Sequence, residues 1–220
     1  TVFRLLPESA TDEPVAPSGD DNVSGASDVA ENYARGCALL YGEGVGRDTQ
    51  MGLRLLRAAG ESGHLNAQIT LGLLFLKGGM DVVKDEAEAA KWLEKAAIQG
   101  NVMSQSSLGA LYLSKESAAR DPEAGVVWLK RAGGGGDVTA QSTLGLMYGK
   151  GYVVAQNDDE SARWNRMAAD QGAADAQTRM GIAYYRGRGV KRSFEEALRF
   201  FRLAAAQGQA SAMSNLGVMT

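Results

Sequence analysis

The sequence predicts an all-α solenoid of five helix-turn-helix repeats of about 36 residues, followed by one terminal helix. Three periodic features predict this fold. One series of glycines lies at positions 36, 72, 109, 145, 181 and 217, and a second lies at 63, 100, 136, 172 and 208. Aromatic residues keep the same interval at Trp92, Trp128, Trp164 and Phe200. Periods of this length are typical of stacked supersecondary units.

The composition is that of a globular chain, with 220 residues, 45% of them hydrophobic, and a net charge of −3. The charge is uneven, because residues 1–31 carry −6 and the remainder carries +3. That small basic excess has no interleaved aromatic residues, so we expect no nucleic-acid partner. The longest apolar run, Leu71 to Leu76, is far shorter than the roughly 20 residues that cross a bilayer, so we expect no membrane insertion.

Residues 1–27 are rich in Pro, Ser, Asp and Gly and predict a flexible acidic linker. The chain starts with neither Met nor a signal sequence, which indicates a processed product or an excised fragment. The solenoid is expected over residues 28–220, with units at about 28–64, 65–101, 102–137, 138–173 and 174–209 and a partial sixth at 210–220.

The first helix of each unit, helix A, carries apolar or small residues at i, i+4, i+5 and i+8. In the fourth unit these are Ala140, Leu144, Gly145 and Tyr148. The spacing places them on one helix face. Because a glycine inside a helix costs about 1 kcal/mol relative to alanine, we expect another helix to approach closely at Gly145 and its equivalents.

The second helix, helix B, is expected to begin at a capping side chain: Asp85, Asp121, Asp158 and Ser193 in units two to five. Its aromatic residue precedes a pair of small residues by four positions, as Trp92 precedes Ala96. In the first unit the small pair is taken as Ala58 and Ala59, which puts Arg54 in the aromatic column. Regular aromatic spacing beside small residues indicates a packed core rather than an aromatic ladder for a ligand.

The segment from Ala176 to Gly208 resembles the SEL-one-like repeat, a subclass of the tetratricopeptide-like α-solenoids. The shared positions are the glycine and tyrosine of helix A, the glycine turn, and the alanine pair that ends helix B. The resemblance implies a right-handed superhelix whose concave side is lined mainly by helices A. It also implies a scaffold or adaptor role toward other proteins, often in bacterial envelope or signalling pathways.

On that implied concave side, residues at −3, +1 and +5 from the repeat glycine form one row on each helix A. Along most rows the side chain is a hydroxyl at −3, apolar at +1 and basic at +5. The candidate partner-binding residues are Tyr33, Tyr41, Leu73, Lys77, Leu146, Lys150, Thr178, Arg179, Ile182, Tyr185 and Arg186. Two interpretations stay open: solvated helix ends, where basic residues favour the helix dipole, or a groove for an acidic, extended or helical peptide.

The sequence shows no residue set for catalysis. Its one histidine, His64, has no partner for a zinc site and is expected in a surface turn. Cys37 occupies an apolar column and is expected in the core rather than as a nucleophile. We therefore expect no catalytic residue, no metal site, no cofactor and no enzymatic activity.

The predicted function is a protein-interaction scaffold that binds a partner peptide or protein through the concave groove. A periplasmic or otherwise exported bacterial location is favoured over the cytoplasm, and the oligomeric state is left open. The alternative function is a cell-wall-fragment binding protein or hydrolase, peptidoglycan-active or β-lactamase-like. Asp175 near Thr178 is the only carboxylate and hydroxyl pair close to the rows that would suit such an enzyme.

Overall fold

The structure is a computed structural model that describes residues 26–219, which form eleven α-helices. Six are helices A: α1 (Ala26–Tyr41), α3 (Leu65–Lys77), α5 (Val102–Leu113), α7 (Val138–Lys150), α9 (Ala174–Arg186) and α11 (Ala210–Met219). Five are helices B: α2 (Thr49–Glu61), α4 (Glu86–Ile98), α6 (Pro122–Gly134), α8 (Asp158–Asp170) and α10 (Phe194–Ala206). The all-α architecture of five helix-turn-helix repeats and a terminal helix is confirmed.

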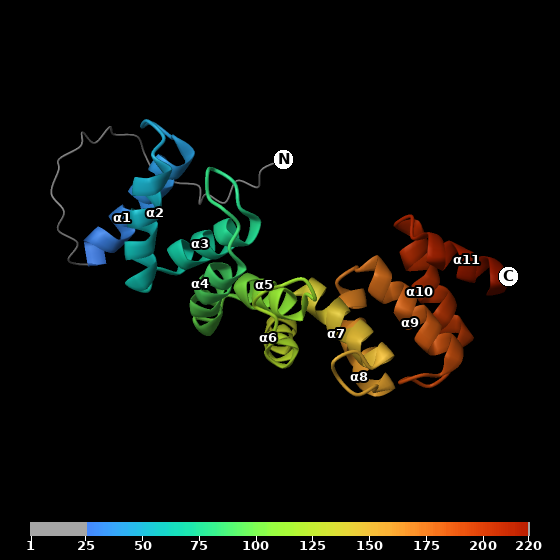
Figure 1. The fold of residues 1–220 in the computed structure, drawn as a ribbon. Helices are drawn as coiled ribbons and strands as arrows, with labels where there is room; N and C mark the ends of the chain where they lie inside the picture. Colours follow the sequence, from blue (N-terminus) through green and yellow to red (C-terminus); the bar gives the residue numbers. More distant parts are fainter. Residues whose placement is uncertain (1–25, 220) are drawn as a thin grey trace.

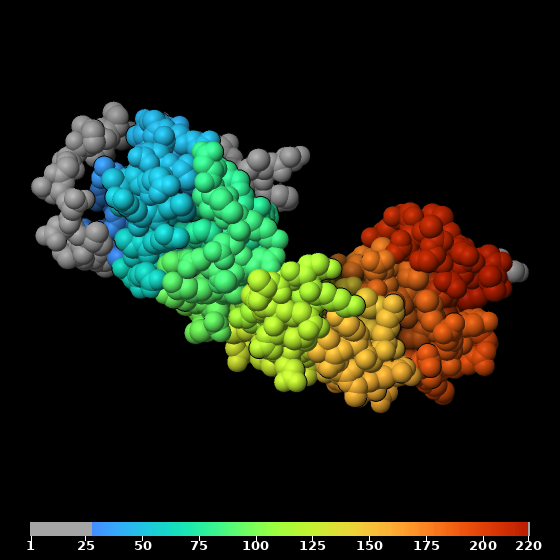
Figure 2. Space-filling model, in the orientation of Figure 1, coloured from blue at the N-terminus to red at the C-terminus, as the bar shows by residue number. Residues whose placement is uncertain are grey.

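Each helix packs on its neighbours in the sequence, so the repeats stack in chain order into an elongated, bent array (Figure 1). Figure 2 shows the same order at the surface, with the first and last helices at opposite ends. In Figure 1, α4, α6 and α8 lie along the outer edge of the bend. The predicted acidic linker lies outside the described residues, except that positions 26 and 27 are the first two residues of α1.

The predicted capping residues start the helices B. Asp85 accepts hydrogen bonds from the backbone N–H groups of Ala87 and Glu88, which have no partner inside the helix. Asp121 and Ser193 act in the same way. In the fourth unit the prediction was wrong by one residue, because the cap is Asn157, whose Oδ1 accepts from the N–H of Glu160.

The repeat glycine of helix A marks the closest approach of helix B, as expected. A Cβ atom added at Gly72 would lie 2.8 Å from Leu93 Cδ2, and one at Gly109 would lie 2.8 Å from Leu129 Cδ2. Such distances are shorter than real contacts allow, so alanine at these positions would push the two helices apart. The helix-B residue that contacts the repeat glycine lies eight residues after the helix-B cap in every complete unit. It is apolar in four units and is Asn165 in the fourth unit.

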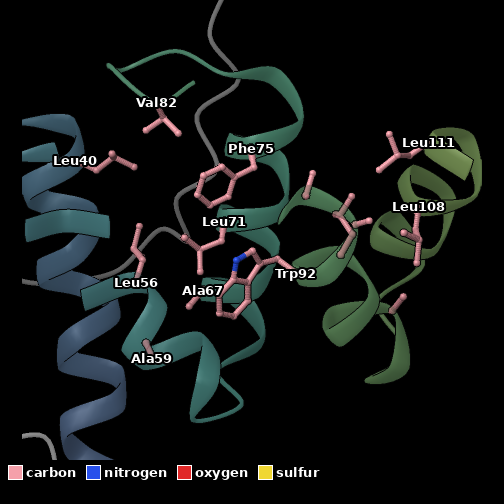
Figure 3. Packing of buried hydrophobic residues seen from close by; sticks show 14 of the residues in the cluster. Leu40, Leu56, Ala59, Ala67, Leu71, Phe75, Val82, Trp92, Leu108 and Leu111 are labelled. Carbon is pink, nitrogen blue, oxygen red and sulfur yellow. The ribbon is translucent and has the colours of Figure 1, made fainter. Parts of the chain in front are cut away.

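The aromatic column is buried core, which confirms that prediction. Trp92 is 1% exposed and lies beside Ala67 and Leu71 of the preceding helix A (Figure 3). A Cβ added at Gly60 would lie 2.8 Å from its ring, so this indole packs directly on the previous helix B. Each aromatic residue therefore joins one repeat to the next.

The first unit required a correction of register. Its buried small pair is Ala59 and Gly60 rather than Ala58 and Ala59. Helix α2 is capped by Asp48, and the residue seven positions later is Leu55. Trp92 also follows its cap, Asp85, by seven positions, so Leu55 rather than Arg54 stands in the aromatic column.

A polar ladder runs beside the aromatic column. The Nε2 of buried Gln68 donates to the carbonyl of Gly60 at 2.9 Å, and its Oε1 accepts from Nε2 of Gln99 in the next helix B at 2.7 Å. The same pair of bonds recurs at Gln141 with Gln171 and at Gln177 with Gln207. These bonds satisfy buried amides while they fix the register between repeats.

His64 lies in the turn between α2 and α3 and serves as the helix cap. Its Nδ1 accepts a hydrogen bond from the N–H of Ala67 at 3.2 Å, and its ring stacks on Tyr33 at 4.5 Å. Burial lowers the pKa of His64, which favours the neutral imidazole that the cap requires.

Replacement of Trp128 by alanine tests the aromatic column. The indole is buried between repeats, so we expect Trp128→Ala to lower the free energy of unfolding by about 3 to 5 kcal/mol. Thermal and urea unfolding followed by circular dichroism measure this loss. If the variant melts within a degree of the wild type, the assignment of Trp128 to the core is wrong.

Acidification tests the cap at His64. The pKa of His64 is lower in the folded protein than its ordinary value of about 6.5. The neutral imidazole therefore stabilises the fold above pH 6.5, and this stability is lost as the pH falls through the lower pKa of the folded state. We expect the wild type to lose more melting temperature than His64→Asn between pH 7.5 and pH 5.5. Asparagine is the matched control because Asn101 caps α5 without titrating. Equal losses in the two proteins would contradict the assignment.

Candidate partner-binding surface

The candidate residues divide into outward and inward side chains. Tyr41, Leu146 and Tyr185 are 42%, 40% and 38% exposed, and Lys77, Lys150 and Arg186 are also exposed. Tyr33, Leu73, Arg179 and Ile182 are partly buried. Thr178 is buried, and its hydroxyl donates to the carbonyl of Ala174 at 3.0 Å. Thr178 therefore offers no group to a partner.

The first column of the rows, at −3 from the repeat glycine, makes contacts within the solenoid. Ser106 Oγ donates to Oδ1 of Asp137, the cap of α7, at 2.9 Å. Ser142 accepts a hydrogen bond from Arg179 of the next helix A. These hydroxyls hold neighbouring repeats together, so the surface open to a partner is made by the +1 and +5 columns.

A cavity of about 250 Å³ lies between α7, α8 and α9. It brings together four candidate residues, namely Leu146, Lys150, Arg179 and Ile182. The other lining residues are Gly145, Gly149, Asp158, Ser161, Ala162, Asn165, Ala183 and Arg188. Tyr33, Tyr41, Leu73 and Lys77 belong to α1 and α3, at the other end of the array (Figure 1).

The cavity exists because two repeat columns change in the fourth unit. Gly149 stands four residues after the repeat glycine, where the other complete units carry leucine or tyrosine. Asn165 stands where they carry leucine or phenylalanine. The two substitutions remove apolar volume from the contact between α7 and α8, and they leave polar atoms in its wall.

A hydrogen-bond network lines the floor of the cavity. Ser161 Oγ donates to the carbonyl of Gly145 at 2.7 Å, and Asn165 Nδ2 donates to the carbonyl of Ser161 at 2.9 Å. Arg179 Nε donates to Asn165 Oδ1 at 2.7 Å. Its Nη2 donates to Ser142 Oγ and, at 3.3 Å, to the carbonyl of Ser142. The guanidinium of this fifth-repeat residue is therefore held in place by both helices of the fourth repeat.

The electrostatics of the cavity are positive. Lys150, Arg179 and Arg188 contribute three cations against the single carboxylate of Asp158, which lies 3.6 Å from Arg188 Nε. Burial lowers the pKa of Arg179, and the Coulombic attraction of Asp175, four residues earlier on α9, opposes this effect. Within residues 26–219 no carboxylate lies within 4 Å of Arg179, so the guanidinium forms no direct ion pair there.

The residues that sequence reasoning missed are Gly149, Ser161 and Asn165. For Asn165 the signal lies in a column of helix B, where it is the polar exception among Leu56, Leu93, Leu129 and Phe201. Gly149 lies on helix A but stands at +4 from the repeat glycine, outside the rows at −3, +1 and +5.

The residues that the sequence offered to the alternative, hydrolytic function make other contacts in the described part of the chain. Between positions 26 and 219 no group of three or more His, Cys, Asp or Glu side chains is placed to hold a metal ion. Asp175 accepts a hydrogen bond from Gln209, while the nearby Thr178 hydroxyl is bonded to its own helix. Cys37 is buried and its pKa is raised by burial, as suits a core residue. None of the described helices has the length and apolarity needed to span a bilayer.

Comparison with known proteins identifies the repeats. A family model described as the Sel1 repeat matches residues 30–64, 65–101, 102–137, 138–172 and 174–209. The crystal structure of a protective antigen present in uropathogenic Escherichia coli strains, displaying an SLR fold, is 32% identical with a TM-score of 0.78 and is matched over 88% of this chain and 41% of that one. The crystal structure of a Sel1 repeat protein from Oxalobacter formigenes is 33% identical with a TM-score of 0.73, over 89% of this chain and 58% of that one.

The chain thus spans about half the length of these two structures. A comparison with proteins of curated function finds no match. Sel1 repeat proteins are generally protein–protein interaction modules built on a non-catalytic scaffold. With five matched repeats and a shared fold, the chain belongs to the Sel1 repeat family.

Proposed function

We propose that this chain is an adaptor module that binds an acidic peptide segment of a partner protein. The binding surface is the outward part of α7 and α9, where Leu146, Tyr185, Lys150 and Arg186 are exposed. The apolar pair supplies area to bury, and the basic pair supplies charge that attracts an acidic partner. We define these four residues as the α7–α9 face.

The observation that carries the proposal is the excess of positive charge around the cavity beside this face. Three cations surround it, and two of them, Lys150 and Arg179, form no ion pair with a described residue. Unpaired cations on a stacked repeat attract an anionic partner and speed its encounter. A negatively charged peptide would also remove the repulsion among these cations.

We further propose an exported location, in an envelope or signalling complex of a bacterium. One similar structure is a protective antigen of uropathogenic Escherichia coli, and a protective antigen is a molecule that reaches the host immune system.

A double charge reversal on the α7–α9 face tests the function. With a partner captured by the full chain and identified by mass spectrometry, we expect Lys150→Glu with Arg186→Glu to weaken binding at least tenfold. Both side chains are exposed and neither forms an ion pair with a described residue, so the melting temperature should not change. Titration calorimetry at low and physiological salt measures the loss, which should be larger at low salt.

The matched control is Arg54→Glu with Arg202→Glu. These exposed arginines lie on helices B, form no ion pair with a described residue, and produce the same change in net charge. The control should keep most of the affinity. If both double variants bind alike, the interface does not lie on the α7–α9 face.

The chain's own acidic residues 8 to 31 are proposed as a competitor for the same cations. We expect a protein without residues 1–27 to bind the partner equally well or more tightly, and to keep its helicity and melting temperature, because the deleted composition has little apolar area to bury. Calorimetry and circular dichroism measure both quantities. Weaker binding after the deletion would place part of the partner contact in the acidic segment itself.

A further inference from the structure

We propose that the cavity between α7, α8 and α9 is a pocket for one carboxylate, that of a glutamate side chain in the partner peptide, with Arg179 as its receptor. This inference rests on the proposed function and adds the residue that the partner must present. It does not follow from the exposed charges of the α7–α9 face, because Arg179 lies inside the solenoid wall rather than on its rim.

The hydrogen bonds of Arg179 leave one side of the guanidinium available. Its Nε and Nη2 donate to Asn165 and Ser142, and these bonds fix the plane of the group. Nη1 has no acceptor among the described residues, and it is not among their fully buried, unsatisfied atoms. An oriented guanidinium with free hydrogens is a preferred partner for a carboxylate.

A partly buried arginine without a direct ion pair is costly in a folded protein, because desolvation of the charge is only partly offset; for Arg179, burial outweighs the attraction of Asp175. The lowered pKa of Arg179 is a consequence of that burial. Lys150 lines the same cavity without an ion-pair partner, and the one carboxylate in the lining, Asp158, is paired with Arg188, so the site keeps an excess of positive charge. An incoming carboxylate would supply the missing charge.

The size and walls of the cavity select a side chain rather than a larger molecule. Its volume of about 250 Å³ lies below the roughly 300 to 1,000 Å³ of sites for drug-sized ligands. Leu146, Ile182 and Ala183 give it apolar walls, which suit the two methylene groups of glutamate. An inorganic phosphate has no apolar part to place against them.

The other repeats show which residue types the fourth and fifth repeats lack where they form the pocket. Where Asn165 stands, the other units place leucine or phenylalanine against the repeat glycine. Where Arg179 stands, two residues before the repeat glycine, the other complete units carry alanine, serine or threonine. The exchange of a buried apolar contact for a polar pair is the kind of local departure found at functional sites.

The test uses propionate as a mimic of the glutamate side chain and propionamide as its neutral isostere. In the full wild-type chain we expect propionate to shift the Arg179 Nε–H resonance and the methyl resonances of Leu146 and Ile182 in a saturable way, with a dissociation constant in the millimolar range. Propionamide should leave them in place. This comparison needs no variant, so it does not depend on how a mutant folds. Equal shifts with the two compounds would overturn the proposal.

Two variants separate recognition from structure. Arg179→Gln should weaken propionate binding at least tenfold. Asn165→Leu with Arg179→Thr restores the residue types of the other repeats, so it should abolish binding while its melting temperature stays equal to or above that of the wild type. Arg202→Gln, at an exposed position of α10 outside the α7–α9 face, is the matched control and should change propionate binding less than twofold. Retained propionate binding in the restored variant would overturn the role of Arg179.

Further outcomes identify a different occupant. Inorganic phosphate that binds at least tenfold more tightly than propionate would make this a phosphate site. Propionate that binds only after deletion of residues 1–27 would make the chain's own acidic segment the occupant. Either result overturns the assignment to a partner glutamate. If propionate fails to bind while the Lys150 and Arg186 reversal still weakens the partner, the pocket is wrong and the proposed function stands.

Discussion

The close approach of the two helices at the repeat glycine is the contact on which the whole array depends. At Gly109 an added Cβ would lie 2.8 Å from Leu129 and 3.1 Å from the carbonyl oxygen of Gly125, so side chain and backbone of helix B both limit the space. The pairing fixes the height and tilt of helix B on helix A. Since each unit repeats this contact, successive units can stack through the same aromatic residue and the same glutamine ladder.

That repeated geometry explains how one unit tolerates a polar cluster. In a solenoid each repeat is stabilised by its own helix pair and by its two neighbours. The fourth unit keeps its contacts to the preceding unit, because Trp164 packs on Gly133 and Gln141 Nε2 donates to the carbonyl of Gly133 at 2.8 Å. The departures at Gly149 and Asn165 lie in the contact between α7 and α8, inside the unit. The contacts that stack the fourth repeat on the third therefore do not depend on the apolar side chains that Gly149 and Asn165 replace.

Sequence periodicity predicted the features that every unit repeats, and it was less accurate where units differ. The period, the aromatic core and most caps followed from columns of identical residue types. The first unit was shifted by one position because two overlapping small pairs, at 58–59 and 59–60, satisfy the same pattern, and burial alone separates them. The contacts of Arg179 could not be predicted, because they join Ser142, 37 residues earlier, with Asn165, 14 residues earlier, and their formation depends on the cavity that Gly149 and Asn165 leave.

The surface along helices A therefore differs from one end of the array to the other in how many side chains are free to contact a partner. Near α1 the Tyr33 ring is occupied by its stack on His64, and burial raises its pKa to about 12. In the middle, Ser106 is bonded to the next cap. Toward α9, exposed Tyr185 contacts the exposed ring of Phe194 at 5.5 Å, next to the uncompensated cations of the cavity. Exposed apolar area and unpaired cations lie together there, so we expect an acidic segment to gain most of its binding free energy at the fourth and fifth repeats, while the earlier repeats mainly set its direction.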